Sequence, residues 1–439
     1  MLMRKLSILT IFILLASPLA ITQANAAAPK LGGACSKVGS FGDTPNIRYV
    51  CAKIGGQLVW QQWNKPSSNN NSANKSGATT SQSGTSAAFK APIPITLPIA
   101  KSSDANAITF ANVLTRISDI PTAVFNKEEA LIAASTLQVI PHDIFIAPAL
   151  QSTVTVKSVS EMVDRSIKYY AGFQQGSYFA VYVYNKASIA WAKKQYNSVA
   201  ATRKYSAVKN YHDRGAQDIE SACNGGDCNG NNAGMISGTN EGYINITVDN
   251  ANHPFIESGS IAHEYGHIVQ SAQWDGTKYD NLNDLKNKTY PGWLFMGGIN
   301  QPAWTICTGT LEGYMQARSQ QGFNLRRSGF KNLTAQGITN YLLYSSTTES
   351  IDVNGKKISE SVLPPNPIFE IGNSTGGLAT EVLVAIGGPQ AVMALHALMA
   401  NGDSMDVAFM KVYSTPWPEA AKIIGQVIAA EYAQTPPKP

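Results

Sequence analysis

Apolar residues follow two different periods along this chain. The helical period predicts helices over residues 159–171, 189–196 and 258–273. Near-continuous apolar runs predict strands over 139–148 and 178–184, with a glycine-rich strand or hairpin at 234–248. Beyond these elements the pattern predicts further helices over 310–320, 375–386, 390–399, 402–409 and 419–432. The sequence therefore predicts an α+β half followed by a helical half, together spanning residues 105–439.

The first 104 residues differ in composition from the rest. Residues 1–26 have a basic start, an apolar run and a small-residue ending at Ala26, which predicts a signal peptide and an exported chain. Residues 27–65 have strand composition and predict a small β module. Residues 66–104 are rich in Ser, Asn and Pro and predict a disordered linker.

Charge and hydropathy narrow the possible partners. The net charge is +5 and only 14% of residues are charged, so the composition suggests neither nucleic-acid binding nor a strongly acidic partner. After residue 26 no stretch reaches about 18 apolar residues, which predicts no transmembrane segment in the mature chain. We expect a secreted protein. The β module is either a cell-envelope attachment module or an inert cap.

The chain has five cysteines, a number that fits an exported protein with few disulfides. Cys35 and Cys51 flank strands of the β module, which is too small to be stable without a staple. Cys223 and Cys228 flank a short turn. We expect these two pairs and a free Cys307, although spacing alone leaves the connectivity open.

Candidate chemistry is concentrated in the predicted helix at 258–273. His263 and His267 are one turn apart on a face separate from its apolar residues, where two imidazoles can hold one metal ion. Glu264 lies beside them, where it can take a proton from an attacking water and later return it. Gly266 lowers helix propensity and indicates close approach of another element. The alternative is a surface helix with two unrelated histidines.

This His-Glu-Tyr-Gly-His sequence resembles the HExxH zinc metallopeptidases, and the gluzincin branch in particular. The resemblance implies a Zn²⁺ cofactor held by His263 and His267, Glu264 as general base, and a peptide or protein substrate. It implies a small mixed sheet before the HExxH helix and a helical C-terminal half. The stretch 234–248 is similar to the gluzincin edge strand, which pairs with substrate, but it also fits an ordinary hairpin.

A third zinc ligand is less clear from the motif. Gln273 stands where metzincins carry a ligand and Gln270 where they need Gly, which excludes that branch. Gluzincins carry a Glu on the next helix, in a W-x-x-E-G pattern. In the first matching stretch, Met296 occupies that position, and a thioether is a poor zinc ligand. Glu312, followed by Gly313, is the second match.

Three aspartates compete with Glu312 for this role. Asp275, Asp280 and Asp284 follow the HExxH helix in a polar stretch that predicts an exposed loop. We therefore expect Glu312 to be the third ligand. Four other histidines lie outside metal-like spacing: we expect His142, His212 and His253 to be structural or exposed, and His396 to pack in the core.

The predicted function is a secreted zinc-dependent peptidase. The alternative is a catalytically degenerate relative that binds peptides or cell-envelope components without cleaving them. Met296 motivates this alternative, because it removes the expected carboxylate.

Overall fold

The computed structural model describes residues 30, 34–37, 41–43, 48–54, 57–63, 90–99, 104–208, 214–223, 228, 230–236, 238–248, 259–275, 291–323, 334–344, 351–353, 356–358 and 367–434. The chain divides into two units, residues 1–82 and 83–439. The predicted signal peptide, 1–26, lies outside the described residues.

The first unit contains an antiparallel sheet of three strands. They are β1 (Phe41–Asp43), β2 (Arg48–Ile54) and β3 (Gln57–Trp63), paired in the order β1-β2-β3. Cys35 is disulfide-bonded, and its backbone N–H donates to the Leu58 carbonyl at 2.9 Å. The side chain of its predicted partner, Cys51, lies outside the described part of this unit.

The second unit begins with an α+β half built on four strands. These are β4 (His142–Ile146), β5 (Tyr178–Tyr184), β6 (Asn232–Met235) and β7 (Glu241–Thr247), in the order β4-β5-β7-β6. The first two and β7 are parallel, whereas β6 is antiparallel at the edge. Parallel neighbours need crossover segments. Three helices lie in these crossovers: α2 (Val156–Tyr169), α3 (Ile189–Thr202) and α4 (Gly215–Ser221).

The stretch 234–248 is thus a hairpin whose outer strand is β6. The strand that precedes the HExxH helix, β7, lies inside the sheet rather than at its edge. All residues of β5 are buried, which explains its near-continuous apolar sequence.

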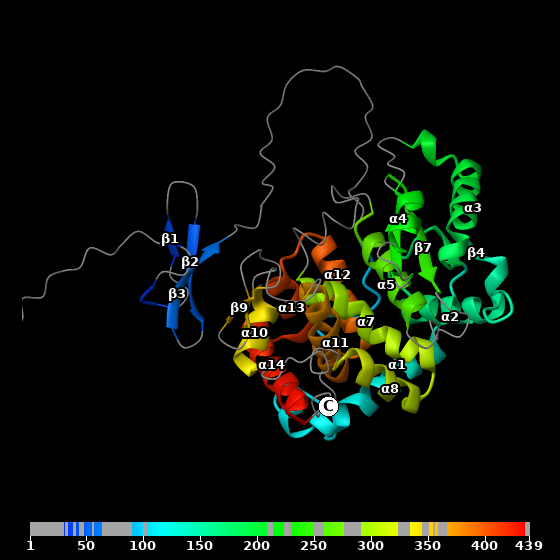
Figure 1. The fold of residues 1–439 in the computed structure, drawn as a ribbon. Coiled ribbons are helices and arrows are strands. Elements are labelled where there is room, and N and C mark those ends of the chain that lie inside the picture. The colour runs from blue at the N-terminus through cyan, green and yellow to red at the C-terminus, as the bar shows by residue number, and fades with distance from the viewer. Residues whose placement is uncertain are drawn as a thin grey trace, which may run out of the picture. The chain divides into compact units, whose positions relative to one another are not determined.

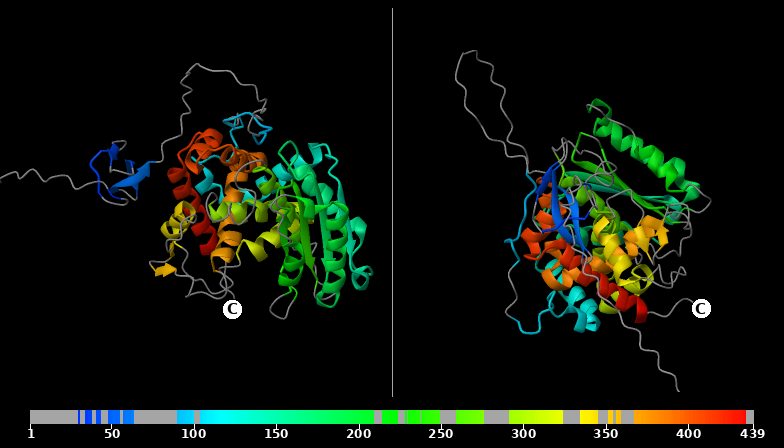
Figure 2. Two further views of the ribbon diagram at one scale, coloured as in Figure 1. Left: turned by 90° about the horizontal axis from the view of Figure 1, so that it is seen from above. Right: turned by 90° about the vertical axis from the view of Figure 1, so that its left-hand side faces the viewer.

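The remaining elements are almost all helical (Figure 1). The longer helices are α1 (Ile120–Ala134), α5 (Ser260–Ala272), α7 (Gly292–Thr308), α8 (Leu311–Gln321), α10 (Ala335–Tyr344), α11 (Pro367–Gly387), α12 (Pro389–Ala400), α13 (Met405–Tyr413) and α14 (Trp417–Gln434). A short hairpin pairs β8 (Ile351–Val353) with β9 (Lys356–Ile358), and single 3-10 turns occur at 113–115, 117–119, 148–150, 186–188 and 205–207. The mixed α+β prediction is confirmed. Figures 1 and 2 show the sheet on one side of this unit and α10–α14 on the other, with α5 and α7 between them.

The break between α11 and α12 follows from local sequence. Gly388 adopts a φ of 83°, which favours glycine, and Pro389 starts the next helix without needing an N–H partner. Among the described residues no single helix is both long and apolar enough to cross a membrane. The bent pair Gly372–Gly387 and Pro389–Ala400 passes that test by length and composition only.

The predicted linker needs correction at its C-terminal end. Ala91 is buried, and its N–H and carbonyl both bond to the Asn401 side chain, at 2.8 and 3.0 Å. The Ile99 N–H donates to the Val412 carbonyl at 3.0 Å, and the alternate apolar residues between these points pack against the core. Residues 90–99, which we call the strap, therefore belong to the second unit. Their prolines prevent regular structure but do not prevent packing.

Candidate metal site

Helix α5 lies between the sheet and helix α7. Its Ile268 side chain packs so closely on Gly176 and Gly242 that a Cβ on either would lie 3.0 or 2.5 Å from it. The Tyr265 hydroxyl, on the same face, donates to Gln175. The helix begins after its N-cap residue Gly259, whose φ of 81° favours glycine.

The opposite side of α5 packs on α7 through Gly266. A Cβ on Gly266 would lie 2.6 Å from Ile299 Cγ2 and 2.7 Å from Ile299 Cβ. The close approach predicted from this mid-helix glycine is confirmed. Gly259 makes a similar approach, since its Cβ would lie 3.1 Å from Ala303 Cβ.

The two HExxH histidines project from α5 side by side. Their ring centroids are 5.1 Å apart and the rings are nearly perpendicular, at 86°. His267 also packs on the Phe295 ring of α7, with centroids 4.7 Å apart. Burial lowers the pKa of His263 to about 4, and a hydrogen bond with the Asn300 side chain acts in the opposite direction. His263 is therefore neutral at pH 7, the form that binds a metal.

Glu264 lies next to this pair and is 6% exposed. Burial raises the pKa of its carboxyl to about 8. At this pKa most of the carboxyl is protonated at pH 7, so it can accept a proton from water only where a nearby positive charge lowers its pKa.

Two amide side chains in the described part of the chain act on the histidines. Gln270 Oε1 lies 3.1 Å from His267 Nδ1, and Gln270 Nε2 donates to the Phe295 carbonyl at 3.0 Å. Asn300, on α7, donates to the Asn373 carbonyl at 3.0 Å, and its side chain raises the pKa of His263 against the effect of burial. Sequence reasoning used Gln270 only to exclude one branch and missed Asn300. The available signal was a polar residue inside the strongly apolar sequence of α7.

The predicted third ligand is not brought to these histidines. Glu312 is exposed in the first turn of α8, beyond the C-terminal end of α7. Asn300 is eight residues before Thr308, the last residue of α7, which is about 12 Å along the helix. The chain therefore reaches Glu312 from the end of α7 that is farther from Asn300. The described ranges contain no group of three or more His, Cys, Asp or Glu that could hold a metal ion.

Met296, at the ligand position of the motif, and the three competing aspartates complete this account. Met296 is 5% exposed and packs on Gly372 of α11, where a Cβ would lie 3.3 Å from its Cβ and Cγ. Asp275 is half-buried just after α5. Asp280 and Asp284 lie outside the described residues.

The predictions for two isolated histidines are confirmed. His142 stacks on Phe179, and its Nδ1 lies 2.8 Å from the Ile140 carbonyl, as expected for a structural residue. His396 is fully buried on α12, and its Nε2 lies 3.5 Å from Gln270 Nε2. His212 and His253 lie outside the described residues.

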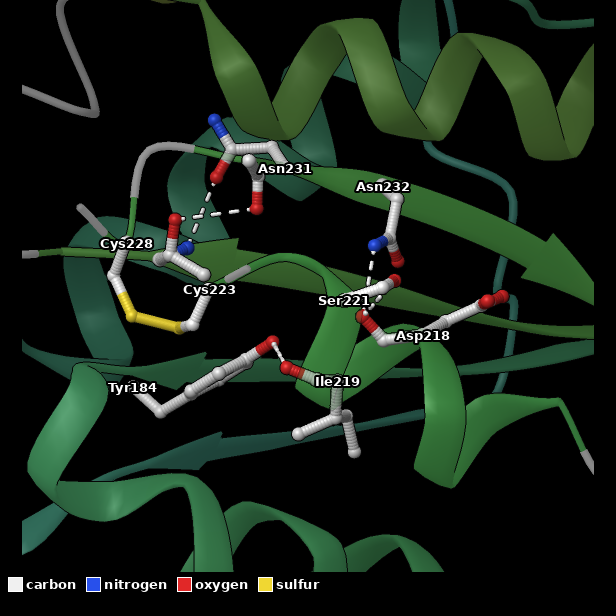
Figure 3. Close-up of a disulfide and its surroundings, with 10 residues drawn as sticks. Tyr184, Asp218, Ile219, Ser221, Cys223, Cys228, Asn231 and Asn232 are labelled. Atoms are coloured by element: carbon white, nitrogen blue, oxygen red, sulfur yellow. Dashed lines mark hydrogen bonds between the residues drawn. A yellow bond between two sulfur atoms is a disulfide. The ribbon is translucent and has the colours of Figure 1, made fainter. Parts of the chain in front are cut away.

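A predicted disulfide lies between the end of α4 and the start of β6 in the chain (Figure 3). Cys223 and Cys228 are bonded, and within the described residues Cys307 is the free cysteine. Just after this loop, Asn231 accepts from the Thr247 N–H at 2.9 Å and donates to Ser260 Oγ at 2.9 Å. The loop end is thereby tied both to the end of β7 and to the first residue of α5.

A second buried carboxyl lies on α1. Glu128 accepts hydrogen bonds from Tyr169, Gln301 and Thr305, and burial raises its pKa to about 8 despite these donors. It provides a comparison for Glu264, because both are buried glutamates with similarly raised pKa values.

Comparisons of this chain with protein-family models, with curated proteins and with solved structures found no match.

Proposed function

We propose that this chain is a zinc-dependent peptidase of the gluzincin type. His263 and His267 would bind the metal and Glu264 would act as general base. One observation carries the proposal: two imidazoles project side by side from α5, with their centroids 5.1 Å apart, next to a buried carboxyl. Imidazole nitrogen is a preferred zinc ligand, and the pair fits two of the three protein positions of a catalytic site.

When bound, zinc supplies a Lewis acid that polarises a peptide carbonyl and acidifies water. The Glu264 carboxylate takes the proton of the attacking water and passes it to the departing amine. Its pKa of about 8 gives it high proton affinity, which a cation at the histidines would moderate.

A third protein ligand is required for this chemistry. Glu312 is the sequence candidate, but it is exposed and separate from the histidines. Asp280 and Asp284 are carboxylates that follow α5 within residues 276–290. We propose that one of these two aspartates completes the site in place of Glu312. Substituting each by its amide identifies it, because the true ligand loses zinc affinity by about 10-fold or more.

Zinc content tests the metal site directly. The protein is purified without added metal as wild type, as His263→Ala and as His142→Ala. His142 is the matched control, because its ring stacks on Phe179 and its Nδ1 lies within hydrogen-bond distance of the Ile140 carbonyl. We expect zinc in the wild type and the control and its loss from His263→Ala. Equally low zinc in all three would overturn the proposal.

Turnover tests the reaction. A mixed peptide library is incubated with wild type, Glu264→Gln and Glu128→Gln, the last controlling for loss of a buried carboxyl elsewhere. We expect zinc-dependent cleavage by wild type and the control only. Peptide binding without cleavage by any variant would support the second candidate, a peptide-binding scaffold, which the buried Met296 at the expected ligand position favours.

A further inference from the structure

The strap, residues 90–99, is attached at both ends to the helical half of the second unit. The Asn401 side chain, just after α12, bonds to both backbone groups of Ala91, and the Ile99 N–H donates to the Val412 carbonyl of α13. Ile99 also packs on the end of α11, since a Cβ on Gly387 would lie 2.7 Å from Ile99 Cδ1. The segment between these two attachments is therefore fixed at both ends.

Between the attachments the strap is extended and has two different sides. Its odd-numbered residues are apolar and pack against the core, whereas its even-numbered residues, three of which are proline, are exposed. This period of two is typical of an extended chain. Proline restricts the conformations of the free segment, so docking loses less conformational entropy.

The middle of the strap contacts the α+β half. Gly172, in the turn after α2, has a φ of 87°, and a Cβ built on it would lie 2.6 Å from Pro94 Cβ and 3.1 Å from Pro94 Cγ. Both residues are exposed, so this contact contributes little stability by itself. Its importance lies in its position, because Gly172 begins the loop that leads to β5.

This loop holds the HExxH helix, α5. Residues 174–176 contact α5 one after another: the first accepts from the Gln273 side chain, the second accepts from the Tyr265 hydroxyl, and the third packs on Ile268. A Cβ on the third, Gly176, would lie 3.0 Å from Ile268 Cγ2. A displacement of this loop would therefore displace α5.

Further hydrogen bonds make the loop stiff. Gln175 Nε2 donates to the Ile167 and Tyr170 carbonyls at 3.3 and 3.2 Å, and the Gln175 carbonyl accepts from the Asn240 side chain at 3.2 Å. A segment that is bonded at several points moves as a unit rather than residue by residue. We therefore expect a shift at Gly172 to be passed on to α5.

We propose that the strap is a latch for α5: while it is docked, it fixes the loop 172–176 and, through this loop, the HExxH helix. Residues 83–89 lead directly into the strap. A pull on this N-terminal segment, or a partner bound to it, would therefore act on α5 through the latch. The proposal concerns the position of the helix and holds whether or not the helix binds zinc.

A pair of proline variants tests the latch in the full chain. Pro94→Gly removes the ring that contacts Gly172 and changes no residue of the loop or of α5. Pro92→Gly is the matched control, because Pro92 is also exposed in the strap but has no atom within 4 Å of the Cβ position on Gly172. Amide hydrogen exchange is followed by mass spectrometry in metal-free protein. In Pro94→Gly we expect exchange to accelerate by about 3- to 10-fold in residues 172–176 and in α5. In the control we expect any acceleration to stay within the strap.

A pair of glycine variants tests the contact from the other side. Gly172→Ala places a methyl group against Pro94, and we expect faster exchange in the strap. Gly388→Ala is the matched control, because its φ of 83° causes the same backbone strain and no described atom lies within 4 Å of the new Cβ. In a Gly172→Ala protein that also carries Pro94→Gly, both obstructing atoms are absent. We therefore expect its strap to exchange no faster than that of Pro94→Gly alone.

The outcomes decide whether the strap acts on α5. Equal α5 exchange in wild type and Pro94→Gly would overturn the latch. Equal acceleration in Pro94→Gly and Pro92→Gly would also overturn it, because strap flexibility alone would then explain the effect. If Gly172→Ala fails to fold, the two proline variants give the answer. Since all measurements use metal-free protein, the latch can be confirmed even where the proposed peptidase function fails.

Discussion

The approach of α7 to α11 offers the sharpest test of how this unit is packed. Gly297 and Gly376 face each other across these helices, and a Cβ on Gly297 would lie 2.0 Å from the Gly376 carbonyl carbon and 2.2 Å from its oxygen. Ordinary van der Waals contact starts at 3.4 Å, so Gly297→Ala requires an opening of 3.4 − 2.0 = 1.4 Å. The obstacle is backbone, so no side chain can rotate away.

The expected magnitude is the difference of two effects. Alanine improves helix propensity over glycine by about 1 kcal/mol. Overpacking costs about 1–3 kcal/mol, and a backbone clash belongs at the upper end. We therefore expect Gly297→Ala to lower the free energy of unfolding by about 2 kcal/mol, a factor of about 30 in the ratio of folded to unfolded protein. The same opening would lengthen the 3.0 Å hydrogen bond from the Asn300 side chain to the Asn373 carbonyl.

Urea unfolding followed by circular dichroism measures this change. The control is Gly298→Ala on the same helix, where the new Cβ meets only side-chain atoms, His396 Nε2 at 3.1 Å and Leu294 Cδ1 at 3.3 Å. Its effect should stay within about 1 kcal/mol because side chains can yield. A Gly297→Ala protein as stable as wild type, or more stable, would refute the reasoning and show that propensity outweighs the contact.

Three further predictions concern other parts of the molecule. Glu128 has a pKa of about 8 in the folded protein against an ordinary 4.5, so its stabilising contribution is complete below pH 4.5 and is lost as the pH rises through 8. The Glu128→Gln variant should therefore show a smaller fall of the melting temperature between pH 5 and 8. A fall as steep as that of the wild type would contradict this. Asn401→Ala removes both hydrogen bonds to Ala91, so amide hydrogen exchange over the strap should accelerate by about 10-fold, the equivalent of about 1.4 kcal/mol. Unchanged exchange would show that apolar packing alone holds the strap on the second unit. Replacing Cys223 and Cys228 by Ser opens a short loop and should lower the free energy of unfolding of the second unit by about 2 kcal/mol in urea titrations. An unchanged unfolding midpoint would contradict this.

Local sequence determined most of the elements near the candidate site. The spacing of apolar residues predicts strand β5 and helices α2, α5 and α12, and nearby residues that disfavour regular structure limit them. Both signals depend on only a few neighbouring residues. The placing of His263, Glu264 and His267 is equally local, because a helix brings residues four apart to one face wherever it lies. Gly266 even predicted a close neighbour, since a mid-helix glycine is costly without one.

The identity of that neighbour, and everything it brings, was decided by tertiary packing. Ile299 and Asn300 reach α5 only because α7 lies between α5 and α11, a relation between residues more than 30 apart in the chain that no local period encodes. The motif-based expectation placed Glu312 on the helix that packs against α5. The helix that packs there is α7, which ends at Thr308, and Glu312 is exposed in the first turn of α8. The packing of the strap could not be predicted from local sequence for the same reason, because its partners Asn401 and Val412 lie some three hundred residues away in the chain. Short-range patterns specify which side chains share a face, but which face meets which is determined by long-range packing of the whole core.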